Sequence, residues 1–115
     1  QFDIITAWEV LEHIAEDDLP QLFKNISIHL TETGYFIASI ADWDDIDPES
    51  GVNWHVTVHP YQWWVQKFSE AGFTICTSNF DVIDLARGGY NPPHCYEKPY
   101  PDIDLAKSLY IAVHK

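Results

Sequence analysis

Four apolar runs along the chain have the length and composition of β-strands. FDIITA at residues 2–7 is almost continuously apolar, which is typical of a strand covered on both faces of a sheet. YFIASI at 35–40 has the same character. The pattern predicts two further strands, FTICTSNFDV at 73–82 and SLYIAV at 108–113.

Between these runs, two segments carry apolar residues at helical spacing, which predicts helices over 17–31 and 60–71. Acidic residues and a proline open the first helix, and a proline and a glycine bound the second. The boundary residues are Asp17, Asp18 and Pro20 for the first helix and Pro60 and Gly72 for the second. The apolar positions are Leu19, Leu22, Phe23, Ile26 and Leu30 in the first helix and Trp64, Phe68 and Ala71 in the second.

The order of these elements is strand, helix, strand, helix, strand, strand. Because strands joined by a helical crossover run parallel, the first three should be parallel, and the last, which returns without a helix, antiparallel. Right-handed crossovers in a sheet that grows in one direction put both helices on one face. The sequence therefore predicts an α/β fold in a single partial domain, 1–115. It is half of a doubly wound sheet, with three parallel strands, a final antiparallel strand and two helices on one face.

Composition limits the partners and the location. The chain has 115 residues, 46% of them hydrophobic, which is enough for one compact domain. Its net charge of −12 disfavours nucleic acid and anionic lipid, and no apolar run is long enough to span a bilayer, so we expect a cytoplasmic protein. Cys76 and Cys95 show no framework spacing and are expected to be free thiols. The start at Gln1 and the absence of methionine suggest a piece of a longer protein.

Titratable residues gather in the segments that follow the predicted strands. WEVLEHI at 8–14 follows the first strand, an acidic loop at 41–58 the second, and a loop at 83–107 the third. In a parallel sheet, ligands bind at the carboxyl ends of the strands. We therefore expect a site where these segments meet, and its histidines are His13, His55 and His59.

Four blocks of the chain resemble one family. FDIITAWEVLEHI, LTETGYFIASIA, HPYQWWVQKFSEAGF and SLYIAVHK are similar to the carboxyl-terminal half of a class I S-adenosylmethionine-dependent methyltransferase of the type 11 and 23 group. The resemblance covers nearly the whole chain and implies strands four to seven of that fold. It also implies a parent enzyme that moves a methyl group to an oxygen or nitrogen of a small molecule or glycan precursor.

The resemblance does not include the family's main cofactor-binding features. These are a glycine-rich loop after the first strand of the fold and an acidic residue that ends the second, and the chain contains no G-x-G-x-x-G pattern. The fragment alone is therefore expected to be inactive and to bind S-adenosylmethionine weakly. By resemblance, the cofactor-binding residues are Ala7, Trp8 and Glu9, with the indole of Trp8 near the sulfonium. Simple packing of Trp8 is the alternative.

Three interpretations of Glu9, Glu12 and His13 remain open. In some relatives, including ubiquinone-pathway O-methyltransferases and small-RNA 2′-O-methyltransferases, an ExxEH set holds a divalent metal that acidifies a substrate hydroxyl. By this resemblance all three residues would be ligands, with His59 or His55 as a fourth, and such a set suits zinc or iron better than magnesium or manganese. Alternatively, His13 is a catalytic general base, with His59 as a second catalytic candidate. In the third interpretation, the three residues are only structural.

The remaining candidates are in the loops. By resemblance, the loop 41–58 closes over the acceptor, with Trp43, Trp54 and His55 facing the substrate, and a solvated mobile loop is the alternative. A nucleophile at His94-Cys95 is not expected, because no third partner is evident. A function of another class, a non-catalytic half-domain acting in assembly, also remains open. We expect the fragment to form homo-oligomers through residues 2–7 or an uncovered sheet face.

Overall fold

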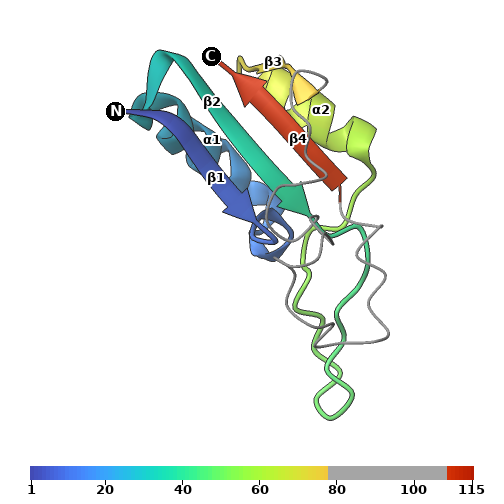
Figure 1. Ribbon diagram of the computed structural model, residues 1–115. Helices are drawn as coiled ribbons and strands as arrows, with labels where there is room; N and C mark the ends of the chain where they lie inside the picture. The colour runs from blue at the N-terminus through green and yellow to red at the C-terminus, as the bar shows by residue number, and fades with distance from the viewer. Residues whose placement is uncertain (78–108) are drawn as a thin grey trace, which may run out of the picture.

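The computed structural model describes residues 1–77 and 109–115, which form an α/β fold around a four-stranded mixed sheet (Figure 1). The elements are β1 (Phe2–Trp8), the 3-10 turns η1 (Leu11–His13) and η2 (Glu16–Asp18), α1 (Leu19–His29), β2 (Leu30–Ile40), α2 (Tyr61–Glu70), β3 (Thr74–Ile75) and β4 (Leu109–His114). The predicted third strand beyond Thr77 and the loop 83–107, with His94 and Cys95, lie outside the described residues.

The strand order is β1-β2-β4-β3. β1 pairs with β2 in parallel, and β4 pairs antiparallel with both β2 and β3. The first three strands therefore run in one direction and the last strand runs against them, as predicted. The carboxyl ends of β1 and β2 lie side by side, and the chain that leaves β2 extends beyond this edge of the sheet (Figure 1).

Both helices cover the same face of the sheet, as predicted. Phe23 of α1 and Phe68 of α2 meet with ring centroids 4.4 Å apart, and Phe36 of β2 lies 5.8 Å from Phe68. Burial of these large apolar side chains is the main source of stability for the domain. The buried members of this core are Leu11, Leu19, Phe23, Ile26, Leu30, Phe36, Ala38, Ile40, Trp64, Phe68, Phe73, Ile111 and Val113.

The other face holds a smaller apolar cluster. Its buried members are Ile37, Cys76 and Ala112, with Trp8 and Tyr35 packed against them. The expectation of an uncovered apolar face is therefore wrong at the centre of the sheet, where these side chains are out of solvent. Exposed apolar surface remains on β1, where Phe2 and Ile4 are 59% and 56% exposed.

The first helix is shorter than predicted. α1 begins at Leu19 and ends at His29, and Asp18 lies at the N-cap position without a side-chain capping hydrogen bond. Pro20 occupies the first turn, as predicted. The TETG segment at 31–34 does not form a separate turn, because the chain becomes extended at Leu30 and enters β2 directly.

Gly34 lies where a side chain would be crowded by its neighbours. A Cβ atom there would lie 3.0 Å from the carbonyl oxygen of Phe2 and 3.0 Å from a methyl carbon of Leu30. The register of β1 against β2 shifts nearby, between Phe2 and Ile4. The glycine therefore lets β1 and β2 approach closely where their pairing is irregular.

The end of α2 is a complete Schellman motif. Gly72 has φ +88° and donates its N–H to Ser69, and the N–H of Phe73 reaches the carbonyl of Phe68. Gly72 therefore ends the helix, as predicted, whereas Pro60 lies at the N-cap and not inside the first turn. Cys76, directly after β3, is a free and buried thiol, and burial raises its pKa.

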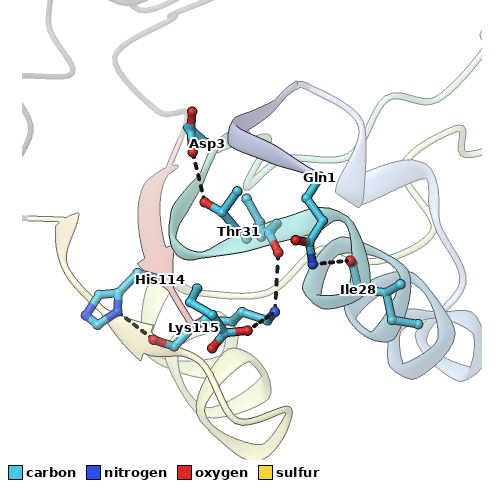
Figure 2. A network of polar contacts seen from close by, with 8 residues as sticks. Gln1, Asp3, Ile28, Thr31, His114 and Lys115 are labelled. Atoms are coloured by element: carbon cyan, nitrogen blue, oxygen red, sulfur yellow. Dashed lines mark hydrogen bonds and ion pairs between the residues drawn. The ribbon is translucent and has the colours of Figure 1, made fainter.

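Polar contacts join the strands at the edge opposite to the carboxyl ends of β1 and β2 (Figure 2). Thr31 Oγ1 donates to Asp3 Oδ1 at 3.0 Å. Lys115 Nζ donates to the carbonyl of Leu30 at 3.3 Å and to Glu32 Oε1 at 3.0 Å. These contacts tie the start of β1, the start of β2 and the end of β4 together.

Candidate functional site

The first strand ends in a strained residue. Glu9 has φ +54°, the left-handed region that non-glycine residues rarely adopt, and it is the only described non-glycine residue with positive φ. Its N–H is held by both the carbonyl oxygen of Ser39 at 3.0 Å and the hydroxyl of Ser39 at 3.2 Å. The chain therefore turns sharply after Trp8 and enters η1.

At positions i, i+3 and i+4, Glu9, Glu12 and His13 would share one face only if the segment were α-helical. The segment 8–14 contains the short turn η1 and no α-helix, so the i, i+3, i+4 relationship does not apply to Glu9. Glu12 and His13 lie within η1 and Glu9 before it. Glu9 therefore does not share one helical face with Glu12 and His13.

Glu12 is a fully buried carboxylate, with 0% of the residue exposed. Neither of its carboxylate oxygens has a hydrogen-bond partner in the structure of residues 1–77 and 109–115. Burial raises the pKa of Glu12 and the charge of Glu9 raises it further, whereas the amides of Glu12 and Ala41 and the ring of His13 oppose the rise. These amides lie close but make no hydrogen bond of ordinary geometry with the carboxylate. Such a group is costly to bury, which makes Glu12 a candidate functional residue.

The acidic loop after β2 forms a hairpin, which we call the 42–57 hairpin. Its two arms are joined where Asp47 N–H reaches Val52 O and Trp54 N–H reaches Asp45 O, both at 2.8 Å. Thr57 holds the second arm against the turn after β1. Its N–H donates to Glu12 O at 3.0 Å, and its hydroxyl donates to Ile14 O at 2.6 Å. The hairpin is therefore an ordered element against η1.

Two histidines are oriented by carbonyls of this hairpin. His13 Nδ1 lies 2.7 Å from Trp54 O, and His55 Nδ1 lies 2.5 Å from Trp43 O. A carbonyl oxygen only accepts, so each Nδ1 carries a proton, and in the neutral form of each ring the lone pair is on Nε2. The ring centroids lie 4.8 Å apart at 76°, with His55 buried and His13 exposed.

Glu12, His13 and His55 together form one cluster. One potential ligand atom from each lies within 4.8 Å of the corresponding atoms of the other two. An unpartnered carboxylate and two imidazole lone pairs can accept a proton from a bound molecule or share a cation. The cluster lies directly after β1, at the edge where the strands end, as predicted.

The comparison with protein families identifies the class of protein. The family described as "Methyltransferase domain" matches residues 1–82, which is most of the chain. The chain belongs to this methyltransferase family. A comparison with curated proteins found no match. Membership implies the use of S-adenosylmethionine as the methyl donor. Within the described ranges, this methyltransferase domain contains no helix long and apolar enough to cross a membrane.

Other predicted residues of the methyltransferase domain lie apart from the cluster. His59 Nε2 bonds Glu16 Oε1 at 2.6 Å, and its ring stacks on Trp63 at 3.9 Å. The geometry therefore brings His55, and not His59, to Glu12 and His13. The ring of Trp43 lies 5.8 Å from that of His55, whereas the side chain of Trp54 is exposed.

The cofactor candidates divide between the two sheet faces. Ala7 is partly buried and packs against the helix-side core. Trp8 packs against the smaller cluster on the opposite face. Glu9 lies between the strand end and the Glu12 cluster.

Sequence reasoning missed three polar residues of this region. Ser39 holds the turn at Glu9, and Thr57 joins the hairpin to η1. The hydroxyl of Tyr110 is buried without a hydrogen-bond partner among the described residues, and burial, with the charge of Glu9, raises its pKa. Ser39 lies in register between Trp8 and Tyr110. For Ser39 and Tyr110, the available signal was a polar residue near the end of an apolar strand.

Proposed function

We propose that this methyltransferase domain transfers a methyl group from S-adenosylmethionine to an oxygen or nitrogen of a small molecule or glycan precursor. In this proposal, the sheet corresponds to strands four to seven of a class I Rossmann-like methyltransferase. Glu12, His13 and His55 form the centre that activates the acceptor. The observation that carries the proposal is the buried, unpartnered Glu12 carboxylate beside two imidazoles with free Nε2 lone pairs.

The reaction is an in-line displacement at the methyl carbon. The acceptor atom forms the new bond, the sulfonium sulfur keeps the electron pair of the broken bond, and the acceptor proton leaves. His13 is the base in this proposal, because it is exposed to an incoming acceptor and its neutral ring, with Nδ1 bonded to a carbonyl, has its lone pair on Nε2. The hydrogen bond to Trp54 O stabilises the imidazolium that forms, and the main contribution of the domain is positioning.

The same three residues fit a divalent cation. Glu12 supplies an anionic ligand that has no other partner, and His13 and His55 each carry the carbonyl contact on Nδ1 that fixes metal-ligating histidines elsewhere. Two imidazoles and one carboxylate suit zinc or iron(II) better than magnesium. Bound there, the ion would acidify an acceptor hydroxyl. Glu9 is outside this group, so the ligand set differs from the one that the resemblance implied.

For the cofactor, the proposal uses the end of β1 and the sheet face opposite the helices. Trp8 would present its indole to the sulfonium by cation–π attraction. The hydroxyl of Tyr110 offers a donor that has no partner among the described residues. Glu9 is included among the proposed cofactor-binding residues because it lies at the strand end, where its backbone is strained.

A second candidate function is assembly without catalysis. The observation that favours it is the exposed apolar surface of Phe2 and Ile4 on β1, whose only partner among the described strands is β2. The first function predicts that a labelled methyl group moves from S-adenosylmethionine to an acceptor, and the second predicts no such transfer.

The test is transfer of tritiated methyl from S-adenosylmethionine by the full-length protein to pools of hydroxylated and amino compounds. His13→Ala should reduce transfer by about a hundredfold or more, whereas the matched variant His59→Ala should retain most of it. Full activity of His13→Ala would contradict the assigned centre. Cofactor binding without transfer to any pool would favour assembly.

A further inference from the structure

The second arm of the 42–57 hairpin has its polar side chains inside and its apolar side chains outside. Burial alternates along it: Asn53 is half-buried and His55 and Thr57 are buried. Val52, Trp54 and Val56 between them are 44%, 55% and 56% exposed. An apolar row in solvent beside a buried polar row is the reverse of ordinary surface packing, so the outer row requires an explanation.

An acidic row lies beside this apolar row. Ile46 and Asn53 form an antiparallel bridge, which places Asp45 opposite Trp54 and Asp47 opposite Val52. Side chains of directly opposed residues lie on the same face of an antiparallel pair. The outer face of the hairpin therefore combines carboxylates with an exposed indole.

Asp47 keeps its negative charge on this face. Its carboxylate accepts hydrogen bonds from the hydroxyl of Ser50 at 2.6 Å and from the N–H of Glu49 at 2.9 Å. These bonds, with that of Ser50 first, lower its pKa. Asp45 is exposed and adds a second carboxylate.

The outer face points away from the Glu12 cluster, because His55 lies on the inner face of the same arm. A molecule on the outer face is therefore distinct from an acceptor at the cluster. The negative charge of this face limits the kind of molecule that can bind there. A nucleic acid or an anionic membrane would be repelled by the acidic row, and a second copy of this chain that docked with the same face would bring the same two carboxylates.

We propose that the outer face of the hairpin, made by Val52, Trp54, Val56, Asp45 and Asp47, binds a segment of a partner protein that is rich in basic and apolar side chains. Apolar side chains of the segment cover Val52 and Val56. A Lys or Arg side chain lies over the indole of Trp54 and pairs with the facing carboxylate of Asp45. The proposal is independent of the methyl-transfer chemistry.

The experiment uses two fluorescent hexapeptides, one with alternating lysine and leucine and one with alternating glutamate and leucine. Binding to the purified protein is measured by fluorescence anisotropy at physiological ionic strength. The basic peptide should bind and the acidic one should not. Trp54→Ser should weaken binding by about tenfold or more, and Asp45→Asn by several-fold.

Ile28→Ser is the matched control, because Ile28 on α1 is as exposed as Trp54, at 55%. This variant should bind the basic peptide like the wild type. Absence of binding, equal binding of both peptides, or equal losses in Trp54→Ser and Ile28→Ser would overturn the proposal. Light scattering that shows a dimer dispersed by Trp54→Ser would assign the surface to a second copy and also contradict it. Circular dichroism should show that all the variants remain folded.

Discussion

His13 and His55 lie with ring centroids 4.8 Å apart, and each donates its Nδ1 proton to the backbone carbonyl of a tryptophan in the 42–57 hairpin. The first ring belongs to the turn after β1, and the second belongs to the hairpin itself. The hairpin therefore orients both imidazoles through its main chain. Because the carbonyls belong to the backbone, substitution of Trp43 or Trp54 should preserve this orientation wherever the hairpin stays folded.

Glu12→Gln should increase the stability of the metal-free protein. The substitution keeps the shape of the side chain and replaces a buried, unpartnered carboxylate by a neutral amide, which is less costly to desolvate. We expect the free energy of unfolding at mildly alkaline pH to rise by about 1 kcal/mol. Urea denaturation measures this value, and a clear loss of stability would show that the carboxylate makes favourable contacts in the native state.

The same residue predicts a pH dependence of stability. Because the pKa of Glu12 is raised above its usual value of 4.5, the native state binds more protons than the unfolded state as the pH rises above that value. The contribution of Glu12 should therefore be most favourable below pH 4.5, decline as the pH rises through the folded-state pKa and then level off. Thermal melts at a series of pH values should show this decline in the wild type and a flatter profile in Glu12→Gln.

Two other carboxylates give the opposite slope in a lower range. Hydrogen bonds lower the pKa of Asp47 and of Glu70, so their stabilisation is present above their usual values of 3.8 and 4.5 and is lost as the pH falls. The decrease in stability caused by ionisation of Glu12 should therefore be seen at higher pH than the losses due to Asp47 and Glu70. A profile that rises throughout the same window, identical in wild type and Glu12→Gln, would contradict the assignment.

Gly34→Ala should destabilise the sheet. The added methyl group would meet the carbonyl oxygen of Phe2 and the side chain of Leu30 at 3.0 Å, so the backbone at Phe2 must shift slightly where β1 enters the sheet. We expect a loss of about 1–3 kcal/mol, the usual cost of overpacking. Thr33→Ala, at an exposed neighbouring position, is the control and should change the free energy of unfolding by less than about 0.5 kcal/mol.

Much of the fold could be predicted because the spacing of apolar residues along the chain indicates which segments are strands and which are helices. The strand directions and the common helix face follow from the order of elements and from the handedness of crossovers. Helix boundaries were less accurate at the start of α1, because an acidic residue before a helix does not reveal whether its side chain caps the first turn. Asp18 occupies the position without making the bond.

The grouping of the candidate residues could be predicted only in part. Its location followed from the strand ends, and Glu12, His13 and His55 were all among the candidates. Their grouping depends on the backbone at Glu9 and on the hairpin, which brings His55 to the turn across more than forty residues of sequence. Sequence spacing carries no signal of a positive φ at a glutamate, and residue types alone do not separate His55 from His59.

Ile4→Lys should reduce self-association of the 115-residue chain. Ile4 lies on β1, whose only described neighbour is β2, and its side chain is 56% exposed. We predict that pairing through residues 2–7 forms homo-oligomers and that a lysine on this strand opposes such pairing. Light scattering at tens of micromolar measures the effect, and a monomeric wild type with a cooperative melt would contradict it.

The most direct test of the Glu12–His13–His55 centre is a titration of the purified protein with Co²⁺, followed by visible absorption. The wild type should bind the ion with absorption bands typical of nitrogen and oxygen ligands. Glu12→Gln, His13→Ala and His55→Ala should each lose about tenfold or more in affinity, whereas His59→Ala should match the wild type. A wild-type titration without such bands, or equal affinity in wild type and His55→Ala, would contradict cation binding at this centre.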